Sequence, residues 1–178
     1  VVEEAELIAK SFAPTQLMDD TFLKDDLENT FLRNDFRYVH IASHGQFSGD
    51  AASTFVLTYD DYLTLDDLEN LIRPSSYRGA PVELLTLSAC QTAAGDDKAA
   101  LGLAGVAIKA GARAALASLW FVSDQASALM VDEFYRALAK PGTSKAQALK
   151  HAQTVLRNDP RFRHPRYWAP YIMIGNWL

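Results

Sequence analysis

Two short apolar runs constrain the fold of this chain more than any other feature. VELLTLSAC (82–90) and ARAALASLW (112–120) contain small or apolar residues at most positions. Parallel strands that helices cover on both faces have this composition. Between the runs, AALGLAGVAIKAGA (99–112) has the small residues of a helix that packs closely against a sheet. The order strand, helix, strand predicts a parallel α/β sheet.

The same alternation of helical and strand patterns extends along most of the chain. We therefore expect an α/β fold, a three-layer sandwich with a mostly parallel central sheet flanked by helices. The other expected helices are 2–12, 21–34, 64–72, 123–140 and 144–157; the other strands are 36–45 and 169–177; residues 53–65 form a strand, an acidic turn and a short continuation; residues 74–81 and 158–168 are loops.

Composition limits the classes of protein that remain. With 178 residues, of which 49% are hydrophobic, residues 1–178 are expected to form a single domain. The net charge of -5, without a basic block, argues against a nucleic-acid partner. A single cysteine allows no internal disulfide, and no apolar run approaches the roughly 18 residues that span a bilayer. These features predict a cytoplasmic protein with no membrane contact, and the helix-like start at Val1 suggests a fragment of a longer chain.

Three candidate site loops follow predicted strands. They are SHG (43–45), SACQT (88–92) and LWFVSD (119–124). In α/β sheets, ligands bind at the carboxyl ends of the strands, so these loops are expected on one rim. Cys90 there could attack a carbonyl carbon, with His44 as the base that later protonates the leaving group. The backbone N–H groups of Gly45 and Cys90 could bind the developing oxyanion.

Each of these residues also has a simpler interpretation. A lone cysteine is often a buried structural residue, although Cys90 follows a strand instead of lying inside one. His40, deeper in the apolar run, is expected to have a structural role. The His40 and His44 spacing lacks the Glu of HExxH, so a metal site is not expected, and no glycine pattern of a phosphate-binding loop is present.

Five segments together carry a family resemblance. YVHIASHG, LLTLSACQTAAG, GLAGVAIKAGARAALASLWFVSDQAS, FYRAL and YWAPYIMIGNW, in this order, resemble the CHAT domain, a relative of caspases and separases. The 46-residue separation of His44 and Cys90 agrees with the caspase pattern of about 50. The local caspase signature differs, because Ser88 stands in place of Gln and Thr92 in place of Gly.

The resemblance implies a cysteine endopeptidase with a His44 and Cys90 dyad and no cofactor. It also implies a substrate pocket near Trp120, Phe121 and Asp124. Asp124 matches an acidic residue with which separases contact a basic side chain, whereas Phe121 occupies a position where separases typically have Asp. Asp124 is equally well explained as a capping residue of the helix that follows it.

The resemblance leaves alternatives open. CHAT domains are often fused to tetratricopeptide (TPR) repeats, which implies that an adjacent domain or a partner regulates access to a protein or peptide substrate. Caspase-like domains also persist as inactive interaction modules, in which Cys90 would be inert. A weaker alternative is an α/β enzyme that uses Cys90 on a small acyl substrate. Self-cleavage after Lys98, the only basic residue of its loop, is a further hypothesis.

Overall fold

The computed structural model describes two compact units of the chain. Its described residues are 2–47, 54–88, 91–92, 105, 108 and 110–178. One unit, here called the sheet unit, comprises Leu17–Phe121 and Ile174–Asn176. The other, the helical unit, comprises Val1–Gln16, Val122–Met173 and Trp177–Leu178. Each unit is described by itself.

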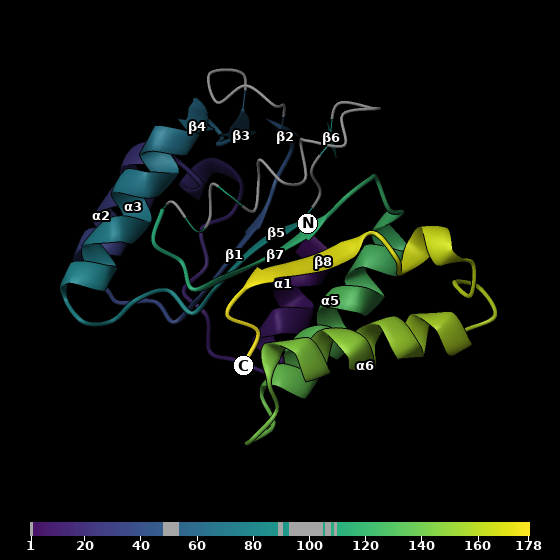
Figure 1. Ribbon diagram of the computed structural model, residues 1–178. Coiled ribbons are helices and arrows are strands. Elements are labelled where there is room, and N and C mark those ends of the chain that lie inside the picture. The colour runs from purple at the N-terminus through teal and green to yellow at the C-terminus, as the bar shows by residue number, and fades with distance from the viewer. Residues whose placement is uncertain (1, 48–53, 89–90, 93–104, 106–107, 109) are drawn as a thin grey trace. The chain divides into compact units, whose positions relative to one another are not determined.

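The sheet unit is built on a four-stranded sheet with the order β1-β5-β7-β8 (Figure 1). β1 pairs in parallel with β5, and β5 pairs in parallel with β7. Every residue of β5 and β7 is buried, as the two apolar runs predict. The bounds are β1 Tyr38–Ala42, β5 Leu84–Ser88, β7 Ala114–Ser118 and β8 Tyr171–Gly175, of which Ile174 and Gly175 belong to this unit.

A second, smaller sheet has the order β4-β3-β2-β6 and was not predicted. The strand expected over 36–45 ends at Ala42, and Gly45 begins a new strand instead of a loop. This part of the prediction is wrong because Gly45 pairs with Val56 of β3. The expected strand, turn and continuation within 53–65 are confirmed as β3 and β4. The bounds are β2 Gly45–Phe47, β3 Phe55–Leu57, β4 Tyr62–Thr64 and β6 Gln91–Thr92.

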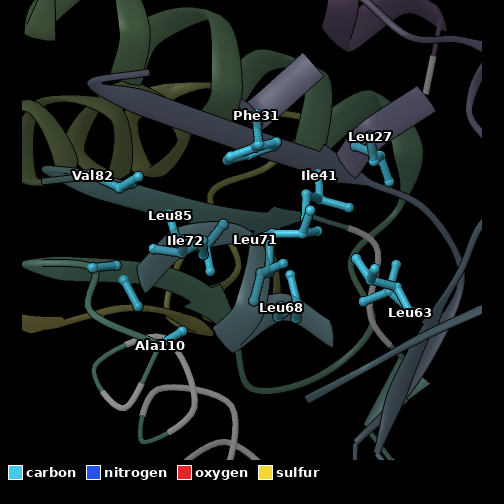
Figure 2. Packing of buried hydrophobic residues seen from close by; sticks show 14 of the residues in the cluster. Leu27, Phe31, Ile41, Leu63, Leu68, Leu71, Ile72, Val82, Leu85 and Ala110 are labelled. Atoms are coloured by element: carbon cyan, nitrogen blue, oxygen red, sulfur yellow. The ribbon is translucent and has the colours of Figure 1, made fainter. Parts of the chain in front are cut away.

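The described helices of the sheet unit are α2 (Lys24–Arg33) and α3 (Leu65–Tyr77), with a 3-10 turn, η1, at Asp19–Thr21. Their apolar faces meet β1 and β5 in one buried cluster (Figure 2). Its larger members are Leu27, Phe31, Ile41, Val56, Leu63, Leu68, Leu71, Ile72, Val82, Leu85 and Leu87.

The prediction of a loop over 74–81 is wrong for its first part, because α3 continues through Pro74 to Tyr77. Proline removes one helical N–H donor but still offers its carbonyl, which accepts the N–H of Arg78 at 3.2 Å. The Arg78 guanidinium also donates to the carbonyl of Phe31 at 3.3 Å and to Asp35 at 2.8 Å. These contacts hold the last turn of α3 against the end of α2.

The helical unit contains α1 (Val2–Ala9), α5 (Asp124–Leu138) and α6 (Lys145–Asn158). α6 begins with a capping box, in which Ser144 and Gln147 satisfy each other's backbone N–H groups. The 158–168 region, expected to be a loop, includes a 3-10 turn, η3, at Pro165–Tyr167. Buried residues of this unit include Ile8, Met130, Phe134, Tyr135, Leu149, Leu156 and Phe162.

The structure confirms a mixed α/β protein with a mostly parallel sheet. The three-layer caspase arrangement and the single domain stay predictions. Of the helix expected over 99–112, the described residues Gly105 and Ile108 are helical, and most of the others lie outside the described residues. Among the described helices, none combines the length and the apolar character that crossing a bilayer requires.

Candidate active site

His44 lies in a two-residue link between the two sheets. β1 ends at Ala42, and β2 begins at Gly45, so Ser43 and His44 connect the parallel sheet to the smaller one. Ser43 is half-buried, whereas the His44 residue is exposed. This placement at the carboxyl end of a parallel strand agrees with the rim on which ligands bind in α/β sheets.

Leu57 of β3 holds this link through its own backbone. Its N–H donates to the carbonyl of His44 at 2.8 Å, and its carbonyl accepts the Ser43 hydroxyl at 2.7 Å. No cis peptide bond occurs among the described residues, so the His44 carbonyl and the Gly45 N–H point in opposite directions. Since β2 lies between β3 and β6, the Gly45 N–H is directed away from β3, toward the edge of β2 that faces β6.

Cys90 lies outside the described residues, but the backbone on both sides of it is described. Ser88, two residues before Cys90, pairs with Ala42, two residues before His44. Gln91, one residue after Cys90, pairs with Gln46, two residues after His44. Hydrogen-bonded strands lie about 4.8 Å apart. The described residues that flank His44 are therefore paired with the described residues that flank Cys90, once in each sheet.

The other predicted pocket residues fall in different units. Trp120 and Phe121 follow β7 in the sheet unit and are 41% and 63% exposed. Asp124 is the first residue of α5 and belongs to the helical unit. The cap residue of α5 is Ser123, whose side chain makes no capping hydrogen bond. A carboxylate in the first turn is favourable for the helix dipole, so Asp124 has a structural explanation that does not need a ligand.

Two further expectations concern metals and self-cleavage. Among the described residues, no group of three or more His, Cys, Asp or Glu side chains is placed to hold a metal ion. Lys98 lies outside the described residues, and self-cleavage after it stays a prediction.

Neither the role of Leu57 nor the pairing of β2 with β6 was predicted from the sequence. Strands of two or three residues have too few positions to show an alternating pattern. The residues FVL at 55–57 did indicate a strand, but nothing local indicated its partner at 45–46. This partner follows from the long-range register of the small sheet.

These observations define an α/β protein in which the residues flanking His44 pair with the residues flanking its single cysteine. The chain belongs to the CHAT domain family, whose model matches residues 1–176. This family is associated with the caspase-like peptidase fold. The chain is also similar to tetratricopeptide repeat protein 28 of Homo sapiens, with 33% identity over 98 residues, and to that of Mus musculus, with 34% identity over 97 residues. The matches cover 54% and 53% of this chain but 4% of each relative.

Proposed function

We propose that the chain is a cysteine endopeptidase in which His44 and Cys90 form the catalytic dyad. The observation that carries the proposal is the double pairing of the flanking backbone, Ala42 with Ser88 and Gln46 with Gln91. The pairing of residues on both sides of His44 and Cys90 supports the proximity that proton exchange between an imidazole and a thiol requires. Membership of the CHAT family supports the same chemistry.

The proposed reaction proceeds through an acyl-enzyme. The Cys90 sulfur attacks the scissile carbonyl carbon while His44 takes the thiol proton. The tetrahedral oxyanion accepts hydrogen bonds from the backbone N–H groups of Gly45 and Cys90. Collapse breaks the C–N bond, and the amine leaves with the proton from His44. Water, deprotonated by His44, then hydrolyses the thioester and restores the thiol.

The proposed substrate is a protein or peptide with a basic residue before the cleaved bond. Asp124 would pair with that basic side chain, and the exposed rings of Trp120 and Phe121 would contact the substrate. The relatives are named for tetratricopeptide repeats. These names support the part of the proposal in which repeats of the full-length chain, or a partner, control access to the site; the proposed location is the cytoplasm.

The test uses an electrophilic peptide mimic with Arg or Lys beside the reactive group. Intact-protein mass is followed for wild type, Cys90→Ala and His44→Ala. We expect one adduct on wild type, none on Cys90→Ala, and formation slowed about 100-fold on His44→Ala. A mimic with Glu at the basic position is the control for specificity. Asp124→Asn should reduce the difference in adduct-formation rate between the basic and the acidic mimic.

The competing function is a catalytically inactive interaction domain. The names of the two relatives refer to repeats and not to a peptidase, which favours this alternative. It predicts that a small alkylating agent modifies Cys90 equally fast in wild type and His44→Ala. That result, together with no adduct from the peptide mimic, would replace the peptidase proposal.

A further inference from the structure

We propose that Ser43 is a positioning residue for the peptide group between His44 and Gly45. Its hydroxyl, through the backbone of Leu57, fixes the peptide that joins His44 to Gly45. The inference rests on the proposed function, because this peptide carries both the imidazole and one of the two oxyanion donors.

Two hydrogen bonds to one residue form the positioning device. The Ser43 hydroxyl donates to the Leu57 carbonyl at 2.7 Å, and the Leu57 N–H donates to the His44 carbonyl at 2.8 Å. Ser43 and His44 therefore form hydrogen bonds with both backbone polar groups of Leu57, its carbonyl and its N–H. The second bond sets the plane of the His44–Gly45 peptide, and the first restricts rotation of the link about that bond.

The support behind Leu57 is itself anchored. The turn that follows β3 is tied to the start of α2, since the Tyr59 N–H donates to the Phe22 carbonyl at 2.9 Å. In the same turn, an oxygen of Asp60 accepts the N–H of Lys24 at 3.1 Å. Leu57 is thus a fixed point of the sheet unit, against which Ser43 can hold the link.

Small displacements of such a peptide affect catalysis strongly. A reacting group misplaced by about 1 Å can lower a rate by about 100-fold. The Gly45 N–H turns with the His44 carbonyl, so loosening the link disturbs the general base and the oxyanion donor together. Loss of the Ser43 hydroxyl should consequently reduce the reactivity of the cysteine without removing any group that touches substrate.

The experiment measures alkylation of Cys90 by iodoacetamide from about pH 5 to pH 9, where a low-pKa thiolate and an ordinary thiol differ. Because the chain has one cysteine, intact mass reports this residue alone. The variants are Ser43→Ala, Ser43→Thr and Ser43→Val. The last two side chains have nearly the same shape, but threonine has a hydroxyl where valine has a methyl group. His44→Ala is the reference for a thiol without its base.

A matched control removes another hydroxyl from the same region. Thr58 donates its hydroxyl to the Asp61 carbonyl at 2.8 Å, within the turn after β3. Thr58→Ala removes a hydrogen bond inside this turn but leaves in place the Ser43 hydroxyl and the backbone donors of Tyr59 and Lys24 that anchor the turn. If Ser43 acted only by stabilising β3, Thr58→Ala would reproduce its effect.

We expect the pH profile of Ser43→Ala and Ser43→Val to move toward that of His44→Ala, with alkylation about tenfold slower near pH 6. Ser43→Thr and Thr58→Ala should keep the wild-type profile. Equal profiles for Ser43→Thr and Ser43→Val, or the same shift in Thr58→Ala, overturn the inference and leave the dyad intact. A wild-type profile identical to that of His44→Ala overturns the dyad itself, and the positioning role with it.

Discussion

At the scale of single residues, Gly175 leaves less room for a side chain than four other described glycines, which are Gly79, Gly105, Gly111 and Gly142. Its φ of +96° belongs to the region that glycine adopts easily. A Cβ atom there would collide with the carbonyl oxygen of Arg113 and lie 3.1 Å from the Cα of Ala114. We predict that Gly175→Ala lowers the free energy of unfolding by about 3 kcal/mol, measured by urea denaturation.

Gly142 provides the control for this prediction. It also has a positive φ, +79°, but no atom lies within 4 Å of the Cβ that alanine would add. Gly142→Ala should therefore cost only the backbone strain, about 1 kcal/mol. Equal losses for the two variants would show that steric contact at Gly175 is unimportant.

Residues at strand ends were more predictable than the residues that support them. His44 was placed near the carboxyl end of a strand because the apolar run stops there, whereas the start of β2 at Gly45 was not predicted. Leu57 was missed because its contacts join segments more than ten residues apart, and a single sequence contains no local signal of that register. The Asp124 prediction illustrates a different limit, since a first-turn carboxylate serves either a helix or a ligand with the same sequence pattern.

At the scale of elements, the start of α3 concentrates several polar contacts on Asp67. The carboxylate accepts the Thr64 N–H at 2.9 Å, the Thr64 hydroxyl at 2.7 Å and the Lys24 ammonium at 2.9 Å. Partial burial opposes ionisation, but hydrogen bonds from Thr64 and Lys24 outweigh it and lower the pKa of Asp67. Because the folded state has the lower pKa, the stabilisation is present above the ordinary value, about 4, and is lost as pH falls through the lowered one.

We predict that Asp67→Asn reduces the free energy of unfolding by about 1 kcal/mol at pH 7. The difference from wild type should shrink as pH falls below about 4, where wild-type Asp67 also loses its charge. Urea denaturation at a series of pH values measures it. Asp66→Asn, which changes an exposed carboxylate of the same turn, should cost about half as much or less. An Asp67→Asn effect that stays constant down to pH 3 would contradict the assignment.

Helix starts were more predictable than helix ends. The spacing of Thr64 and Asp67, three residues apart, predicts a capping box at the start of α3, and the capping box is present. Pro74 was expected to end the helix, but a proline near the carboxyl end removes one donor while leaving its own carbonyl available. The contacts of Arg78 with the end of α2 are tertiary, so the sequence around Pro74 contains no sign of them.

At the scale of the whole molecule, the chain passes between the two units four times. At the last of these passages, Asn176 belongs to the sheet unit and Trp177 to the helical unit. The Asn176 N–H donates to the Arg113 carbonyl in the sheet unit at 2.7 Å, and the Trp177 carbonyl accepts the Ala146 N–H in the helical unit at 3.1 Å. β8 is divided as well, with Tyr171–Met173 in one unit and Ile174–Gly175 in the other. Alternating apolar and helical patterns predicted the elements, but not this division of β8.

Because one strand is shared, neither unit can unfold completely without disrupting β8. We predict a single cooperative unfolding transition, as expected for the single domain inferred from the sequence. Hydrogen exchange in increasing urea, read by mass spectrometry, should give the same unfolding free energy for peptides from α6 and from β5. Phe134→Leu, a change to the fully buried core of the helical unit, should lower both values equally, by about 1 kcal/mol. If only the α6 value fell, the two units would be independent domains and the single-domain prediction would be wrong.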